Sequence, residues 1–257
     1  MIYFYSIPDL KFAMKIGAKG KGPDEFLLPM FVETSNDDLC LWGYSNPLLV
    51  RQFSVDSNIN FVLNKEFHLK KYEAFNQMHI IQDSIFVYST IPVEYAIKLY
   101  DLKNAKQLGE IKIKKDNNRN SSLCSDRGII AVNDSCIIYV YNFKRQIDLF
   151  DIKTLELKKS LIGDYKYRKP QDNYQENINY YLNVVAGKRY FYTLYRGDKY
   201  KNMNENVNTI EVFDYRGNPV IKYHFDISPN LFYVDEENGV MYGYVYKYPD
   251  VLFKYVL

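Results

Sequence analysis

The chain has 257 residues, of which 47% are hydrophobic and 17% aromatic, including 26 tyrosines. This composition supplies a substantial core and excludes an intrinsically disordered chain. Lys and Arg number 33 against 31 Asp and Glu, so the charge balance gives no support for binding nucleic acid or an anionic membrane surface.

Short strands separated by turn residues are predicted along the whole chain. Residues 1–17 hold two of them. Groups of four strands follow in residues 29–69, 75–115, 128–163 and 178–226, and residues 229–257 hold three more. In the clearest strand, Ala96-Ile97-Lys98-Leu99-Tyr100, apolar and polar side chains alternate with the period of two that is typical of β-structure.

One short pattern, an aromatic residue followed by Asp or another polar residue and then an apolar residue, recurs in the third strand of each group. It begins at Tyr5, Phe53, Tyr100, Phe150, Phe213 and Phe253. Spacings near 40–50 residues in a chain of short strands are typical of a β-propeller with one blade per repeat. The sequence therefore predicts an all-β, six-bladed propeller of four-stranded antiparallel blades that forms a single domain over residues 1–257.

The two ends of the chain carry incomplete blades. Residues 1–17 read as the third and fourth strands of one blade, and residues 229–257 as the first three strands of another. About three strands are then absent, and Met1 lies directly before a strand, so the chain is expected to be an N-terminally shortened propeller. The alternative is a five-bladed ring in which the two end pieces merge.

The longest spacing, between Phe150 and Phe213, is explained by an insertion in the fourth complete blade. Residues 197–208 are rich in Lys, Asn and Asp and lie between the second and third strands of that blade. Loops of this length in a compact domain are usually functional or disordered. We expect the insertion to project from one face of the ring and to be mobile without a partner.

A glycine-rich string between the first partial blade and the first complete blade is the most distinctive local motif. It comprises Gly17, Gly20, Gly22, Pro23 and Phe26, followed by Pro29. Crossing from an outer strand to an inner strand needs tight turns with positive φ, which glycine tolerates. Phosphate binding by such a loop would need a following helix, whereas strand residues follow here. We therefore interpret the string as a structural linker.

This string, with the blade pattern around it, resembles NHL-type repeats. More closely, it resembles the TolB-like six-bladed propellers of Bacteroides-type bacteria, in which G-x-x-G-x-G-P-x-E-F joins successive blades. The resemblance implies an exported periplasmic or cell-surface protein with no established activity. No signal peptide is visible, and no apolar stretch approaches the roughly 20 residues of a membrane-spanning helix.

The cysteines and histidines do not assemble a catalytic motif. Cys40, Cys124 and Cys136 contain no C-x-x-C pair, and their odd number cannot complete a disulfide framework. Cys40 and Cys136 lie in apolar runs and are expected to be buried, whereas Cys124 lies in a polar stretch where an exposed thiol is expected. The polar stretch Asp235–Gly239 is expected to be a hairpin turn ending in Asn-Gly.

Residues near the starts of first strands are the default ligand-binding candidates, because ligands of propellers usually meet the channel mouth and the loops of one face. These candidates are Gln77, His79, Arg127 and Tyr180. The sequence predicts no catalytic residue, no metal site and no cofactor.

The leading hypothesis is a monomeric, non-enzymatic propeller that binds a protein, peptide or carbohydrate on one face. Its basis is the lack of any cluster of His, Cys, Asp or Glu in the sequence pattern. The alternative is a propeller hydrolase or lyase that uses a divalent metal in the central channel, and a third reading is a scaffold for the assembly of another chain.

Overall fold

The computed structural model describes most of the chain. The described residues are 2–6, 9, 11–16, 20, 25, 29–34, 39–43, 46–56, 61–69, 75–90, 95–113, 124–164, 168–171, 173–202 and 208–257. Contacts divide the chain into two compact units. The first comprises Met1–Glu73, Met78–Phe86 and Leu99–Leu108, and the second comprises Ala74–Gln77, Val87–Lys98 and Gly109–Leu257. Whether these units form one domain stays a prediction.

The first part of the chain forms a hairpin and a four-stranded antiparallel blade. The hairpin is β1 (Ile2–Ser6) with β2 (Lys11–Ile16), and the blade comprises β3 (Pro29–Thr34), β4 (Leu39–Gly43), β5 (Asn46–Val55) and β6 (Phe61–His68). The next four strands are β7 (Phe75–Ile81), β8 (Ile85–Thr90), β9 (Ala96–Asp101) and β10 (Lys106–Lys112). Strand β3 pairs in parallel with β7 through Glu33 and His79, which joins these two blades in one eight-stranded sheet.

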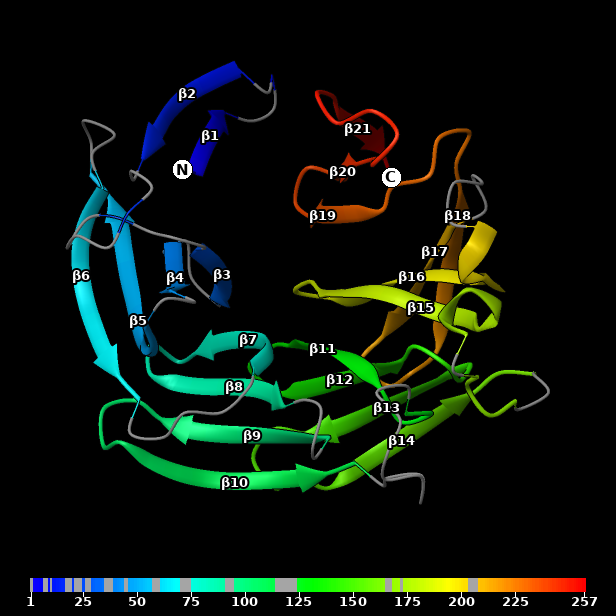
Figure 1. The fold of residues 1–257 in the computed structure, drawn as a ribbon, viewed down its shortest axis with the longest axis horizontal. Coiled ribbons are helices and arrows are strands. Elements are labelled where there is room, and N and C mark those ends of the chain that lie inside the picture. Colours follow the sequence, from blue (N-terminus) through cyan, green and yellow to red (C-terminus); the bar gives the residue numbers. More distant parts are fainter. Residues whose placement is uncertain are drawn as a thin grey trace. The chain divides into compact units, whose positions relative to one another are not determined.

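The second unit contains two complete blades and one of three strands, each ordered as in the sequence (Figure 1). The first blade comprises β11 (Gly128–Val132), β12 (Cys136–Tyr141), β13 (Gln146–Asp151) and β14 (Leu157–Ile162). The second comprises β15 (Ile178–Ala186), β16 (Tyr190–Lys199), β17 (Thr209–Asp214) and β18 (Pro219–His224). The last comprises β19 (Leu231–Asp235), β20 (Val240–Tyr244) and β21 (Leu252–Val256).

Two short 3₁₀ helices, η1 (Tyr174–Glu176) and η2 (Tyr200–Asn202), lie beside β15 and β16. The described residues contain no α-helix. None of the helical segments in this described part has the length and apolar character required to traverse a bilayer.

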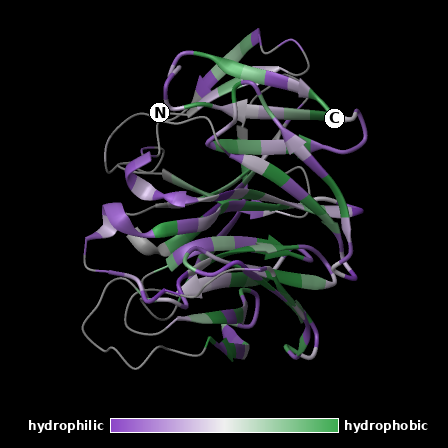
Figure 2. Cartoon of the chain, turned by 90° about the vertical axis from the view of Figure 1, so that its right-hand side faces the viewer, coloured by the Kyte–Doolittle hydropathy of each residue, from purple (hydrophilic) through white to green (hydrophobic). Residues whose placement is uncertain are grey.

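Packing of one blade on the next explains the burial pattern. All six residues of β12 are buried, whereas the outermost strands β14 and β18 are mostly exposed. One core cluster joins β11–β14 to β15–β18 and includes Ile138, Leu149 and Phe191. A second joins β15–β18 to β19–β21 and includes Leu194 and Met241. Apolar residues accordingly concentrate on the strands, with many polar residues in the turns (Figure 2).

The strand predictions are confirmed. The motif residues Tyr5, Phe53, Tyr100, Phe150, Phe213 and Phe253 all lie in strands, in β1, β5, β9, β13, β17 and β21. The turn at Asp235–Gly239 is also confirmed, since the Asp235 carboxylate accepts the Asn238 backbone N–H at 3.1 Å and Gly239 has φ +63°. The expected exposure of Cys124 is wrong: the residue is buried, and its Sγ accepts the Asp126 N–H at 3.4 Å.

The Asp of the repeated pattern builds the turn between third and fourth strands. The Asp101 carboxylate accepts backbone N–H groups of Lys103 and Asn104, at 2.9 and 3.1 Å. Asp151 does the same for residues 153 and 154, at 2.8 and 2.9 Å. The Asp214 carboxylate accepts two backbone N–H groups of the β17–β18 turn, at 2.9 and 2.8 Å. Side chains of this type favour turns by such local bonds, so the repeat carries a structural role.

Replacing Asp214 with Ala is expected to lower the thermal unfolding midpoint at neutral pH, and to lower it less in acid. Hydrogen bonds from the Asn218 backbone and side chain lower the pKa of the Asp214 carboxyl. The stabilisation that the Asp214 carboxylate contributes is therefore complete above its pKa in the unfolded chain, which is about 3.9. This stabilisation is lost as the pH falls through the lower pKa of the folded state. Circular dichroism melts at pH 7 and pH 3 measure the difference, and a difference independent of pH would contradict this assignment.

Candidate functional site

One end of the β15–β16 hairpin brings together segments that are distant in sequence. The register pairs Ile178 with Lys199, so the first residue of β15 lies beside the last residue of β16. The connection from β14 reaches β15 through η1, and η2 follows β16 directly. The backbone N–H of Tyr180 donates to the Asn142 carbonyl at 2.7 Å, which adds the β12–β13 turn.

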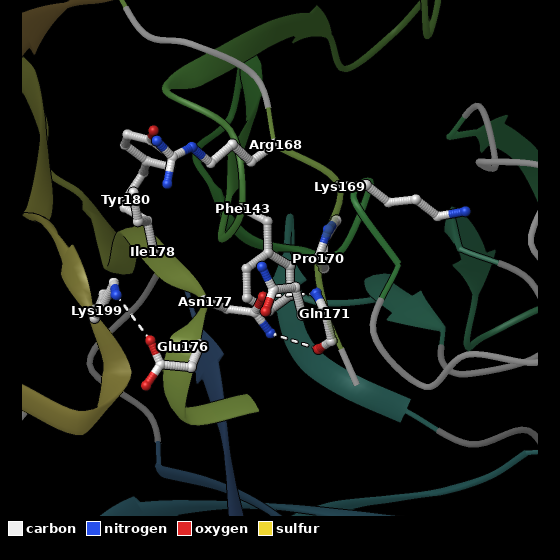
Figure 3. Close-up of a pocket in the computed structure, with 10 residues that line it drawn as sticks. All are labelled: Phe143, Arg168, Lys169, Pro170, Gln171, Glu176, Asn177, Ile178, Tyr180 and Lys199. Carbon is white, nitrogen blue, oxygen red and sulfur yellow. Dashed lines mark hydrogen bonds and ion pairs between the residues drawn. The ribbon is translucent and has the colours of Figure 1, made fainter. Parts of the chain in front are cut away.

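These segments surround a cavity of about 70 Å³ (Figure 3). Its walls combine apolar, amide and charged side chains. They are Phe143, Arg168, Lys169, Pro170, Gln171, Glu176, Asn177, Ile178, Tyr180 and Lys199. The cavity can hold one small polar group of a larger ligand, with the remainder outside.

Two asparagines fix the backbone around the cavity. The buried Asn177 side chain accepts the Gln171 N–H at 2.7 Å and donates to the Gln171 carbonyl at 2.9 Å. Asn173 caps η1, because its Oδ1 accepts the Gln175 N–H at 3.2 Å, as N-cap side chains do. The wall that carries Glu176 is therefore held by hydrogen bonds within its own segment.

Three aromatic rings form a continuous series next to the cavity. Tyr174 of η1 contacts Tyr200 of η2 edge-on, with ring centroids 4.3 Å apart. Phe143 contacts Tyr174 on its other side at 6.2 Å. Both tyrosines are partly exposed, so they present ring surface to a ligand outside the cavity.

The acid at the site is neutralised by its neighbours. The Glu176 carboxylate lies 2.7 Å from Lys199 Nζ and 3.0 Å from Lys201 Nζ. Hydrogen bonds from Lys199 and then Lys201 lower the pKa of this carboxyl. Glu176 is thus ionised at neutral pH and is matched by two lysines.

Three further cations at the site have no carboxylate partner among the residues that the structure describes. Arg168 and Lys169 are exposed, and Arg127 is partly exposed. The guanidinium of Arg168 points toward the Tyr180 ring, whereas Lys169 points outward (Figure 3). Burial raises the pKa of the Tyr174 phenol, and the positive charge of Arg127 opposes that rise. The site therefore has a surplus of positive charge beside aromatic rings.

The four sequence candidates separate into different roles. Tyr180 lines the cavity, and Arg127 lies near Tyr174. Gln77 instead links two strands, since its Oε1 accepts the Ile130 N–H at 2.8 Å. His79 is buried in the first unit, with Nδ1 3.1 Å from Glu33 Oε2. The structure thus gives Gln77 a contact between two sheets and His79 a contact within one sheet, whereas Tyr180 and Arg127 belong to the candidate site.

The glycine string lies mostly outside the described residues, which do not include Gly17, Gly22, Pro23 or Phe26. Pro29 begins β3. The expected positive φ is not found at Gly20, where a Cβ would instead overlap the Glu25 carboxylate. The constraint on this residue is the space that the Glu25 side chain occupies.

Sequence reasoning missed Arg168, Lys169, Tyr174 and Glu176. The available signal was the run Tyr-Lys-Tyr-Arg-Lys-Pro over residues 165–170 in an unusually long connection between blades. The description of residues 197–208 as a projecting, mobile insertion also needs correction. Asp198 and Lys199 continue β16 and pair with β15, and Tyr200 packs on Tyr174. Residues 203–207 lie outside the described part.

Across the described ranges, no group of three or more His, Cys, Asp or Glu side chains is placed to hold a metal ion.

Comparisons with solved structures gave similarities of low sequence identity, and the three matches given below each have a TM-score under 0.5. The matches include Raptor from Chaetomium thermophilum (13% identity, TM-score 0.48, 81% of this chain and 17% of that chain). A second match is KlHsv2 with loop 6CD replaced by a Gly-Ser linker (6% identity, TM-score 0.49, 83% of this chain and 57% of that chain). A third is the WD40 domain of Toxoplasma gondii coronin (12% identity, TM-score 0.46, 80% of this chain and 49% of that chain). The chain thus spans less than two thirds of each of these structures.

A comparison with curated proteins found no match. The family model described as "TolB-like 6-blade propeller-like" matches residues 1–237, which is most of the chain and contains every residue of the cavity. The all-β architecture agrees with this description. The chain belongs to the TolB-like six-bladed propeller family.

Proposed function

We propose that this chain is a binding propeller that recognises an acidic carbohydrate at the site around η1 and η2. The observation that carries the proposal is a cavity lined by Arg168 and Lys169, which have no described carboxylate partner, on the segment that leads to Tyr174 of the Tyr174–Tyr200 ring pair. The positive charge of Arg127 also acts on the Tyr174 phenol. Cationic side chains recognise carboxylate and sulfate groups, and aromatic rings cover the apolar C–H face of a sugar.

The cavity suits one charged substituent of such a ligand. It offers room for a carboxylate or sulfate next to Arg168, with Tyr180 and the amide of Asn177 in its walls. The ring pair lies outside this cavity, where an adjoining sugar residue can rest. A carboxylate of an acidic peptide would fit the same cavity, so carbohydrate is favoured over peptide by the Tyr174–Tyr200 ring pair next to it.

Isothermal titration calorimetry with tri-galacturonic acid and a neutral galactose trisaccharide tests the proposal. The acidic trisaccharide is expected to bind, and to bind more weakly as salt screens the charges. The double variant Arg168→Glu, Lys169→Glu should weaken binding about tenfold or more, because it replaces attraction by repulsion. Tyr174→Ala should weaken binding of the acidic trisaccharide as well.

Lys153→Glu is the matched control. Lys153 lies in the β13–β14 turn at the opposite end of β13 from the cavity, so this charge reversal should leave the affinity unchanged. Equal binding of the acidic and neutral sugars, or equal losses in the control and the double variant, would contradict the proposal. Binding of an acidic peptide with loss of sugar binding would identify a different ligand class.

The expectation of an exported, monomeric protein stays a prediction. An acidic carbohydrate ligand is consistent with a cell-surface or periplasmic location, which fractionation of the producing cells would establish.

A further inference from the structure

A second and larger hollow in the second unit shares no lining residue with the cavity of the η1–η2 site. It occupies about 590 Å³ between the outer strands of two neighbouring blades, β13–β14 and β17–β18. This volume falls in the range of roughly 300–1,000 Å³ that is typical of small-molecule sites. We call it the interblade groove.

The walls of the interblade groove combine aliphatic side chains with charged and aromatic ones. The aliphatic part includes Leu161 and Ile162 of β14 and Val220 and Ile221 of β18. Ile162 is 68% exposed, Val220 49% and Ile221 48%. Clustered exposed apolar side chains are costly in water and often mark a binding site. Since the exposed large apolar residues of the wall, Ile162, Val220 and Ile221, are aliphatic and not aromatic, a flexible hydrocarbon chain fits them better than a sugar or a planar ring.

Charged groups gather at one place along the groove. Glu211 is flanked by two cations, with Lys222 Nζ 3.3 Å and Arg145 Nη2 3.7 Å from the same carboxylate oxygen. Both cations also lie over the Tyr195 ring, at 5.0 Å for Arg145 and 5.1 Å for Lys222. Two positive charges against one negative charge leave this part of the groove positive, and a ligand carboxylate would balance it.

The β17–β18 turn contributes Gly217 to the wall of the groove. Lys159 Nζ donates to the Arg216 carbonyl at 2.8 Å and connects β14 to that turn. Gly217 has φ +77°, and a Cβ at this position would lie only 2.8 Å from Leu161 Cδ2. Glu211 and Lys222 are paired in register further along the same hairpin, so the charged groups are separate from the turn.

From this combination we propose that the interblade groove binds a single-chain aliphatic carboxylate, with the hydrocarbon chain between β14 and β18 and the carboxylate between Arg145 and Lys222. The occupant is chosen by complementarity of both shape and charge. Burial raises the pKa of the Tyr181 phenol in the same wall, so its hydroxyl stays protonated at neutral pH and can donate to the carboxylate.

Titration calorimetry of the full chain with decanoate, below its micelle concentration, tests this proposal. Decanoate is expected to bind with one-to-one stoichiometry. Uncharged 1-decanol should bind about tenfold more weakly, because it lacks the charge-assisted hydrogen bonds, and decyltrimethylammonium should bind least. Equal affinity for the three amphiphiles, or no binding of decanoate, would overturn the proposal.

Two variants locate the binding. Ile221→Trp should fill the groove and abolish decanoate binding, whereas Val256→Trp, at an 85% exposed position on β21, should not. Lys222→Met keeps an apolar stem of similar length and should weaken decanoate about tenfold while leaving 1-decanol unchanged.

Lys158→Met, on β14 but not in the groove wall, is the control for charge. If Ile221→Trp does not fold, the proposal is still tested by comparing the effects of Lys222→Met and Lys158→Met on decanoate binding. Equal effects of these two variants on decanoate would overturn the proposal.

Discussion

Replacing Phe191 with Ala is expected to lower the free energy of unfolding by about 3–5 kcal/mol, the usual cost of removing a buried phenylalanine ring. Phe191 is fully buried in the core between β11–β14 and β15–β18. Its ring stacks on Phe213 with centroids 5.3 Å apart and contacts Tyr215 at 5.9 Å. The substitution leaves a cavity at the junction of two blades, where neither blade can close it alone.

Urea denaturation followed by circular dichroism measures this effect. Phe31→Ala is the matched control, because Phe31 is 59% exposed on β3. Exposed substitutions usually change stability by about 0.5 kcal/mol or less. Similar losses for the two variants would show that the described interblade core does not carry the stability assigned to it.

Replacing Asp148 with Ala is expected to lower the free energy of unfolding by about 3 kcal/mol. This buried carboxylate accepts hydrogen bonds from the Tyr141 hydroxyl at 2.7 Å, Gln146 Nε2 at 2.9 Å and the Ser160 hydroxyl at 2.7 Å. Burial, together with the Asp148 charge, raises the pKa of the Tyr141 phenol, which therefore remains a donor. Removing the acceptor leaves the buried Tyr141 hydroxyl without this partner, which is the expensive outcome, whereas Gln146 and Ser160 can donate to water.

The stability of Asp148→Asn should lie between those of the wild type and Asp148→Ala. Its amide oxygen still accepts a hydrogen bond, whereas its amide N–H₂ group faces other donors. Asp134→Ala, at an exposed position, should have little effect. Thermal and urea unfolding of the three variants give the order. An Asp148→Ala protein as stable as Asp134→Ala would mean that the hydrogen-bond cluster contributes nothing.

The strands of this chain were predictable because turn residues and alternating side chains set them locally. Each of the four ranges predicted to hold four strands, residues 29–69, 75–115, 128–163 and 178–226, contains four observed strands. The role of Asp101, Asp151 and Asp214 was not predicted. Their repetition was visible, but it takes the observed bonds to turn N–H groups to separate a structural acid from a functional one.

The candidate site was less accessible to sequence reasoning. Tyr180 and Arg127 were found because they lie near the starts of first strands. Arg168, Tyr174 and Tyr200 come from two connections with no shared motif, and only the pairing of β15 with β16 brings those connections together. Cys124 was misassigned for a similar reason, because a polar sequence around a residue does not exclude burial under neighbouring loops.

Hydrogen–deuterium exchange with and without tri-galacturonic acid tests the proposed binding function most directly. The account predicts slower exchange on ligand addition in residues 168–178 and 196–202, which form the η1 and η2 sides of the cavity. The β13–β14 turn at residues 152–156 should be unchanged. Protection confined to that turn, or no protection at saturating ligand, would contradict a carbohydrate site at η1 and η2.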